Sequence, residues 1–234
     1  MSGGDWPALT MEDLDRITVR VLREAWRSRP EVRLVSLDGE LAVVKDYGRG
    51  GTWFKGLMGA YLIHREAAAL RRAEGMANVP RLLALPEISA LVMSYLEGVP
   101  ATSLEDGRLD ESFFERLTEM VAALHARGIA HGDLEKLDNI MVTPDGEPAL
   151  VDFTSAILSG ANPLAALALP EVMDNDRRAI YKLKECCAPH LLTAAEREAL
   201  RTRGGLELWF RNMRRYVRAP VKRLSDSGER FKAG

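Results

Sequence analysis

Cysteine is almost absent from this chain of 234 residues. The only two cysteines, Cys186 and Cys187, are adjacent, and no C-x-x-C or mixed His/Cys spacing typical of a zinc site occurs. The sequence therefore gives no support to a disulfide-stabilised secreted domain or to a zinc ribbon. Two thiols that serve only in packing suit the reducing cytoplasm.

Long apolar runs are also missing. No window approaches the ~20 continuous apolar residues that cross a bilayer. Residues 1–16 are acidic and lack the basic-then-apolar layout of a secretory signal. Because 47% hydrophobic and 28% charged residues are ordinary proportions for a globular protein, we expect a cytoplasmic protein with a buried core.

Acidic residues outnumber basic ones over most of the chain, and only its end has an excess of positive charge. Residues 203–234 carry nine Lys and Arg against three acids, and the remainder of the chain is acidic. On a helix, Trp209, Met213 and Tyr216 would share a face, so residues 206–223 are amphipathic and cationic. Such a segment suits an anionic membrane surface, and packing of its aromatic side chains on the protein is the alternative. With an acidic body, no nucleic-acid partner is expected.

Patterns typical of β-strands dominate the first part of the chain. Residues 32–47 contain two such runs around Asp38-Gly39, a strong hairpin signal. Residues 17–22 alternate like a strand, although their apolar spacing also allows a helix. Residues 60–73 predict a helix. Two further apolar runs resemble strands, namely residues 79–85 and 89–98.

Helical patterns dominate from residue 111 onward. Phe113, Leu117 and Val121 share one face of a predicted helix that ends at Gly128. A hairpin follows with its turn at Pro144-Asp145-Gly146. Further helices are expected at about 174–186 and from Thr193, where Thr193-x-x-Glu196 makes a capping box.

This order of elements predicts an α+β protein with two lobes. The first lobe would be a small antiparallel sheet with one helix, and the second would be mainly helical. The expected parts are an N-terminal extension (1–16), an N-lobe (17–95), a C-lobe (96–202) and a basic tail (203–234).

Polar residues that could take part in catalysis or ligand binding follow one another in a fixed order along these elements. Each has an ordinary explanation by itself: a solvated lysine, a helix-surface acid, a turn or a loop cap. Together they match what phosphoryl transfer from ATP requires, which is a cation for the phosphates, oxygen ligands for Mg²⁺ and a carboxylate that orients the hydroxyl. They are Lys45 on a strand, Glu66 on the next helix, Asp133 with Asp138 or Asn139 in the loop "HGDLEKLDN" (131–139), and Asp152 after a hairpin.

In these residues the chain resembles the protein-kinase-like superfamily, over roughly residues 17–200. Its "HGD", where most kinases have H-R-D, is similar to the RIO-type, aminoglycoside-phosphotransferase-like and lipopolysaccharide-kinase-like branches. The resemblance implies a bilobal protein-kinase-like fold that uses ATP and Mg²⁺.

The resemblance also implies a role for individual residues. Lys45 would contact the α- and β-phosphates and pair with Glu66, and Asp133 would be the catalytic base. Asp152, in "DFT", would stand where D-F-G has its magnesium-binding Asp. At the hinge between the lobes, Met93 would lie behind the adenine and the backbone of Ser94 and Leu96 would bond its edge.

The chain departs from the kinase pattern in three places. No G-x-G-x-x-G precedes Lys45, and residues 23–30 contain no glycine. Either Arg27 or Arg29 assists the phosphates, or the nucleotide binds loosely. Thr154 replaces the glycine of D-F-G, which predicts a stiffer turn. No A-P-E motif follows, and the short segment after Thr154 gives little support to a groove for a protein substrate.

The loop "HGDLEKLDN" holds one residue more than H-x-D-x-x-x-x-N. Asn139 directly precedes the apolar run "IMV", whereas placing Asp138 in the metal position would shift that strand by one residue and turn its core face outward. We therefore predict Asn139 as the metal ligand, with the loop bulging at residues 135–137. The bulge would let Lys136 reach the γ-phosphate.

These features predict a Mg²⁺-ATP-dependent kinase that phosphorylates a hydroxyl acceptor. A saccharide or glycolipid is the first expectation, because the overall look is most similar to the lipopolysaccharide-kinase-like branch, which phosphorylates Kdo or heptose sugars. One alternative is a RIO-like serine/threonine protein kinase. Another is a membrane-associated pseudokinase or scaffold, which the missing glycine loop suggests. The expected location is the cytoplasm, with peripheral attachment to the inner face of the membrane.

Overall fold

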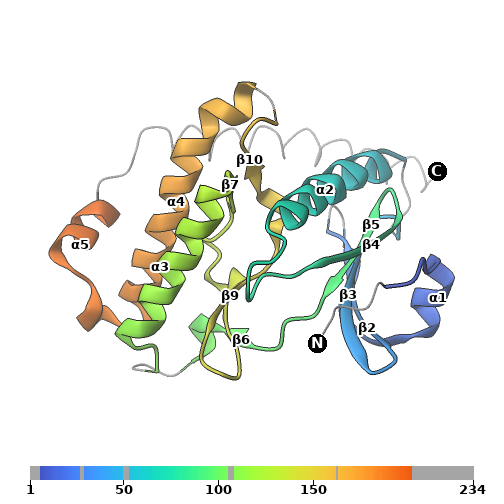
Figure 1. Ribbon diagram of the computed structural model, residues 1–234, viewed down its shortest axis with the longest axis horizontal. Helices are drawn as coiled ribbons and strands as arrows, with labels where there is room; N and C mark the ends of the chain where they lie inside the picture. Colours follow the sequence, from blue (N-terminus) through green and yellow to red (C-terminus); the bar gives the residue numbers. More distant parts are fainter. Residues whose placement is uncertain (1–5, 27–28, 50–52, 105–107, 162, 202–234) are drawn as a thin grey trace, which may run out of the picture. The chain divides into compact units, whose positions relative to one another are not determined.

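The computed structural model describes residues 6–26, 29–49, 53–104, 108–161 and 163–201. The chain separates into two compact units, Met1–Leu192 and Thr193–Gly234. Within the first unit a β-rich part precedes a mainly helical part (Figure 1). The predicted α+β class is therefore confirmed.

A five-stranded antiparallel sheet forms the β-rich part, in the order β1-β2-β3-β5-β4. Between β2 and β3, Asp38 and Gly39 both have positive φ, 51° and 86°, as a type I′ hairpin turn requires. Of residues 17–22, for which the sequence allowed a strand or a helix, all but Ile17 belong to strand β1. The strands are β1 (Thr18–Arg23), β2 (Glu31–Leu37), β3 (Glu40–Asp46), β4 (Leu82–Glu87) and β5 (Ala90–Ser94).

Each face of the sheet is covered by a helix. On one face, Val35 and Val44 pack with Leu14 of α1 (Met11–Arg16) in a small apolar cluster. On the other face, Leu91 joins Ile63 of α2 (Trp53–Arg72) in a core that continues into the helical part. Because side chains alternate along a strand, Val44 and its neighbour Lys45 face opposite sides. Lys45 therefore points toward α2.

Buried charge holds α1 on the sheet. The guanidinium of Arg33, only 2% exposed, pairs with Asp15 of α1. Its Nε lies 3.1 Å from Oε1 of Glu31, and its Nη2 lies 3.9 Å from Oδ2 of Asp46. The predicted N-terminal extension thus contains a helix that belongs to the packing of the first lobe.

Helix α2 begins at Trp53, seven residues before the predicted start at residue 60. The glycines in this stretch indicated a connection, but Gly59 has a packing role within the helix. A Cβ on Gly59 would lie 2.3 Å from Cβ of Tyr47, so only glycine allows the helix to approach the end of β3.

Arginines of α2 bond the helical part of the chain. Arg65 donates from Nε to the carbonyl of Thr154 at 2.9 Å. Arg72 donates from Nη1 to the carbonyl and the hydroxyl oxygen of Ser159, both at 3.0 Å, and to the carbonyl of Gly128 at 3.3 Å. Helix α2 is therefore fixed both to the sheet and to the helical part.

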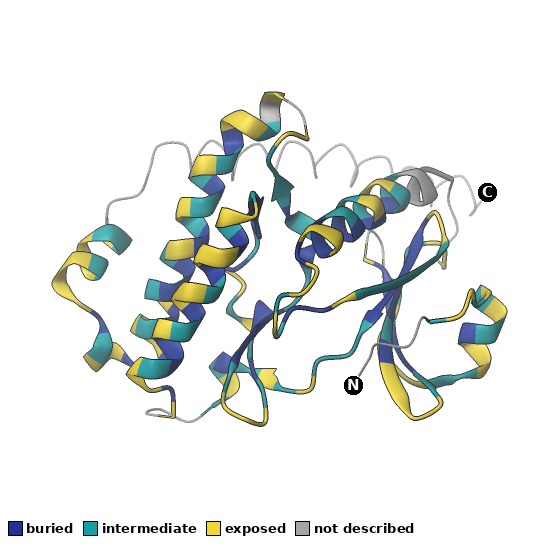
Figure 2. Cartoon of the chain, viewed as in Figure 1, coloured by how far each residue is buried: buried dark blue, intermediate teal, exposed yellow. Residues whose placement is uncertain are grey.

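Two long helices dominate the second part of the first unit, α3 (Glu111–Ala126) and α4 (Pro163–Cys187). Asp110 caps the start of α3, since its carboxylate accepts from the Phe113 N–H at 2.8 Å, and the predicted apolar face is buried. Helix α4 starts well before the predicted 174. Pro163 is compatible with a first helical position, and Pro170 lies inside the helix and masked it in the sequence. Figure 2 shows the buried sides of α3 and α4 turned toward each other.

Short strands surround these helices. The predicted hairpin is β8 (Ile140–Val142) with β9 (Pro148–Leu150), extended by β6 (Val99–Pro100), and β7 (Ile129–Ala130) pairs with β10 (Ile157–Leu158). Single 3₁₀ turns make the remaining corners: η1 (Ala101–Ser103), η2 (Leu137–Asn139), η3 (Phe153–Ser155) and η4 (Pro189–Leu191).

The described part of the second unit is the helix α5 (Ala194–Arg201). The predicted capping box is present, because the Thr193 hydroxyl accepts from the Glu196 N–H at 3.2 Å and the Glu196 carboxylate accepts from the Thr193 N–H at 2.8 Å. The predicted membrane-binding segment, residues 206–223, lies outside the described residues. Among the helices that are described, none is both long and apolar enough to cross a membrane.

Shortening Leu14 tests whether α1 is part of the folded lobe. Leu14 is fully buried, so Leu14→Ala should lower the free energy of unfolding by about 2–4 kcal/mol in urea denaturation followed by circular dichroism. Leu167→Ala is the matched control, since this leucine is 79% exposed and should change stability by less than ~0.5 kcal/mol. Equal effects of the two substitutions would contradict the packing described here.

Candidate active site

A buried ion-pair cluster joins β3, α2 and the turn after β9. The Nζ of Lys45 lies 2.6 Å from Oε1 of Glu66 and 2.8 Å from Oδ1 of Asp152. Lys45 is 5% exposed and Glu66 is fully buried. The structure thus brings together three of the predicted site residues, although they are far apart in the sequence.

The cluster sets the ionisation of its members. Burial alone would lower the pKa of Lys45, but the charges of Glu66 and Asp152 outweigh it and raise that pKa. Burial alone would raise the pKa of Asp152, but the Lys45 ammonium beside it holds that pKa below its usual range. Lys45 and Asp152 therefore carry opposite charges at neutral pH.

The turn that carries Asp152 has an unusual backbone. Asp152 adopts φ 67° and ψ 69°, a left-handed conformation that non-glycine residues rarely adopt. Directly after this turn, the Thr154 hydroxyl lies 2.6 Å from Oδ1 of Asp152 and 2.9 Å from Oε2 of Glu66. The strained turn thus aims the Asp152 carboxylate back toward Lys45.

The loop "HGDLEKLDN" is ordered by its own side chains. The Nδ2 of Asn139 donates to the backbone carbonyl of Asp133 at 2.9 Å, and Asn139 is buried. Asp138 is exposed and accepts from the Thr102 hydroxyl at 2.9 Å. The backbone of Asn139 also accepts from the Val151 N–H at 3.1 Å, one residue before Asp152. Of the two candidates, Asn139 is therefore the one whose side chain lies within the loop, and Asp138 faces the solvent.

Lys136 pairs with the carboxylate of Asp133, three residues before it in the same loop. The Lys136 side chain is 60% exposed, whereas that of Asp133 is 12% exposed. The lysine therefore covers the carboxylate from the solvent side.

His131 supports the base of the same loop. Its Nε2 donates to the Val151 carbonyl at 3.0 Å, and its ring packs on Phe153 with centroids 4.6 Å apart. Burial lowers the pKa of His131, despite the nearby carboxylates, so the imidazole is neutral at pH 7.

Asp176 is a supporting residue that the sequence analysis missed. This aspartate of α4 is 2% exposed and accepts from the N–H groups of His131 (2.7 Å) and Gly132 (3.0 Å), and lies 3.1 Å from Nε2 of His125. A signal was present, because an aspartate at 176 shares the helical face of Ala179 and Leu183 and so falls on the core stripe.

The predicted adenine-binding residues lie at the end of β5. Met93 is buried in the main core. The backbone N–H of Ser94 donates to the Arg81 carbonyl at 2.9 Å, so this group is already used. In the part of the chain that is described, the N–H of Leu96 has no hydrogen-bond acceptor and stays available for a ligand.

The connection between β1 and β2 closes without glycine. Trp26 and Arg29 form an antiparallel bridge, with the Arg29 N–H donating to the Trp26 carbonyl at 2.8 Å. Arg27, predicted to assist the phosphates, lies outside the described residues.

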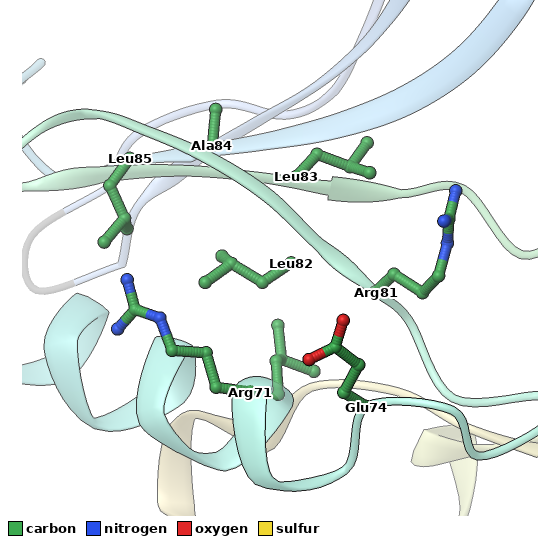
Figure 3. A pocket seen from close by; sticks show the side chains of 8 residues that line it. Arg71, Glu74, Arg81, Leu82, Leu83, Ala84 and Leu85 are labelled. Atoms are coloured by element: carbon green, nitrogen blue, oxygen red, sulfur yellow. The ribbon is translucent and has the colours of Figure 1, made fainter. Parts of the chain in front are cut away.

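A groove of about 400 Å³ lies between the end of α2 and β4 (Figure 3). It is lined by leucines, with Arg71, Glu74 and Arg81 at its sides. None of the predicted site residues lines it, so this groove is separate from the Lys45 cluster. The lining residues are Leu70, Arg71, Glu74, Arg81, Leu82, Leu83, Ala84 and Leu85.

Replacing Asp176 tests its role beneath the loop. In Asp176→Asn one carboxylate oxygen becomes an NH₂ group that faces backbone donors, so the free energy of unfolding should fall by about 1–3 kcal/mol. Asp174→Asn, two residues away at a side chain that is 58% exposed, is the control and should have little effect in the same urea titration. A stable Asp176→Asn protein would contradict this account.

Comparisons with known proteins relate this chain to kinases. A family model described as RIO domain matches residues 57–177, more than half of the chain. "Probable SapB synthase" of Streptomyces coelicolor is 33% identical over 115 residues, which are 40% of this chain and 12% of that protein. CBL-interacting serine/threonine-protein kinase 13 of Arabidopsis thaliana is 32% identical over 108 residues, which are 42% of this chain and 20% of that protein. The chain thus spans a fifth or less of these relatives.

Two solved structures of Rio2 kinase from Chaetomium thermophilum share the fold. The ADP/Mg²⁺-phosphoaspartate complex matches with a TM-score of 0.58 and 20% identity, over 84% of this chain and 68% of that one. The other structure matches with a TM-score of 0.57 and 19% identity, over 82% and 65%. At these identities the likeness shows the bilobal kinase-like fold alone. The family match covers Glu66, the "HGD" loop, Asp152 and Asp176, and with it this chain belongs to the RIO domain family.

Proposed function

We propose that this chain is a Mg²⁺-ATP-dependent RIO-type kinase that transfers the γ-phosphoryl group to a serine or threonine hydroxyl of a protein. The observation that carries the proposal is the buried Lys45–Glu66 pair with the Asp152 carboxylate 2.8 Å from the same ammonium. A cation, its positioning acid and a metal-binding acid are the groups that phosphoryl transfer needs together.

The residues present fit a nucleotide with magnesium. The Asp152 side chain is 30% exposed and ionised, and Asn139 is joined to the same strand end through the Val151 N–H. Mg²⁺ prefers oxygen ligands and takes few of them from protein, keeping phosphates and waters for the rest. The complex of Rio2 kinase, described as holding ADP and Mg²⁺, supports this assignment. Asn139 and Asp152 would hold the metal, which would neutralise phosphate charge.

The protein's own groups divide the remaining work. Lys45, held charged by Glu66, would bind the α- and β-phosphates. Asp133 would orient the acceptor hydroxyl and receive its proton, and its fixed backbone, held by Asn139, sets the direction of its carboxylate. Lys136, which now covers Asp133, would turn to the γ-phosphate when substrate approaches. Leu96 would donate its free N–H to the adenine edge.

The acceptor expected from the sequence differs from the one that the comparisons favour. The saccharide or glycolipid acceptor, first expected from sequence, has no support among the relatives, whereas the family match and a serine/threonine kinase relative favour a protein hydroxyl. The complete set of Lys45, Glu66, Asp133 and Asp152 speaks against a scaffold without activity. A cytoplasmic location and membrane attachment through residues 206–223 remain predictions.

Transfer of label from γ-labelled ATP into fractionated cell extract tests the proposal. Label should enter the protein fraction, and Asp133→Asn should lower the rate by at least ~100-fold because the hydroxyl loses its base. Asp145→Asn, in the exposed turn of the β8–β9 hairpin, is the control and should retain the full rate. Label in the lipid or polysaccharide fraction would restore the saccharide acceptor, and no Mg²⁺-dependent transfer into any fraction would sink the kinase assignment.

The two candidate metal positions can be separated by paired substitutions. Asn139→Ala should lower the transfer rate by ~100-fold or more, since it removes a metal ligand and the bond to the Asp133 carbonyl. Asp138→Ala should cost less than ~5-fold, because this exposed side chain bonds only Thr102 among the described residues. The reverse order would place Asp138 in the metal position.

A further inference from the structure

Thr154 occupies the position where the D-F-G motif has glycine, and its hydroxyl lies among three charged groups. Oγ1 is 2.6 Å from Oδ1 of Asp152, 2.9 Å from Oε2 of Glu66 and 3.4 Å from Nζ of Lys45. All three residues belong to the proposed phosphoryl-transfer site. A glycine could make none of these contacts.

A hydroxyl has one hydrogen to donate and two lone pairs that accept. Lys45 can only donate, so Oγ1 accepts from it. Asp152 and Glu66 each offer a carboxyl oxygen that accepts, so the single hydrogen serves one of them at a time. With both acceptors within reach, the hydroxyl has two alternative bonded states that differ only by rotation about the C–O bond.

The backbone of Thr154 is also fixed to α2. Its carbonyl accepts from both Nε (2.9 Å) and Nη2 of Arg65, the residue directly before Glu66. The Arg65 guanidinium lies over the ring of Tyr61, one turn earlier on the helix, at 5.4 Å from the centroid. Thr154 is therefore tied to α2 at its hydroxyl and at its carbonyl.

We propose that Thr154 is a positioning residue that keeps Glu66 and Asp152 aligned with Lys45. Its hydroxyl donates to Asp152, the nearer of the two acceptors, and would turn to Glu66 if the Asp152 carboxylate held magnesium. Glu66 would then gain a donor while Lys45 bound the phosphates. This inference rests on the proposed kinase function, and it explains the departure from D-F-G: Thr154 bonds α2 through both its hydroxyl and its carbonyl, whereas a glycine could do so only through its carbonyl.

Substitutions at Thr154 separate the hydroxyl from the shape of the side chain. Thr154→Val keeps the branched shape and removes the donor, so kcat should fall by about 10- to 100-fold, the range of a hydrogen bond to a charged group, while KM for ATP changes by less than ~3-fold. Thr154→Ser keeps the hydroxyl and should stay within ~3-fold of the unchanged protein in both constants.

A readout without nucleotide makes the test independent of activity. Amide hydrogen exchange across residues 60–72 of α2 should be faster by about threefold or more in Thr154→Val than in the unchanged protein or in Thr154→Ser. Thr118→Val, which removes a hydroxyl bonded within α3 to the Phe114 carbonyl, controls for the substitution itself and should leave both α2 exchange and kcat unaltered.

The outcomes distinguish this inference from the kinase proposal. If the unchanged protein transfers phosphate and Thr154→Val does so equally well, the inference is overturned and the kinase proposal stands. Loss of activity in Thr154→Ser as severe as in Thr154→Val also overturns it, because shape and not the hydroxyl would then matter. If the unchanged protein transfers no phosphate, the kinase proposal fails, and α2 exchange alone then decides whether Thr154 holds the cluster together.

Discussion

One buried ammonium organises this molecule. An isolated charge taken out of water costs several kcal/mol, so Lys45 is tolerable beneath the sheet only because two carboxylates meet it. One comes from α2 and the other from the turn after β9. Satisfying a single lysine therefore requires that sheet, helix and second lobe come together in one arrangement, and this requirement links the fold to the site.

In the second lobe, buried polar groups of the "HGD" loop likewise require a partner from another element. The backbone of the "HGD" loop turns sharply at Gly132, which has φ 74°. A Cβ added to Gly132 would lie only 2.7 Å from the carbonyl oxygen of Ser155, so a side chain has no room there. The buried N–H groups of His131 and Gly132 both donate to one carboxylate, that of Asp176 on α4. This loop is thus held by a long helix whose own position is set by apolar packing, and the loop needs little stability of its own.

How much the sequence could predict depended on whether a residue's role was local. The β2–β3 hairpin and the capping box at Thr193 follow from neighbours in the chain, and both were predicted. The order of Lys45, Glu66 and Asp152 indicated the site because strand, helix and hairpin each carried its own signal. The predicted starts of α2 and α4 were wrong because glycine and proline occur inside helices as well as at their ends. Gly59 allows close packing against Tyr47 and makes no turn, and Pro170 is accommodated inside α4. Asp176 was missed because nothing local shows that an acid on a core stripe will meet two backbone N–H groups some 45 residues earlier.

The bonds from α2 to the helical part have a consequence for dividing this chain. Arg65 and Arg72 belong by sequence order to the first lobe, yet their acceptors are the backbone of Thr154, Gly128 and Ser159. A fragment cut at residue 95 would remove the acceptors of both arginines and expose the Glu66 carboxylate, which is fully buried in the intact chain. Helix α2 therefore makes polar contacts with both lobes. The smallest fragment that keeps these hydrogen bonds contains both lobes.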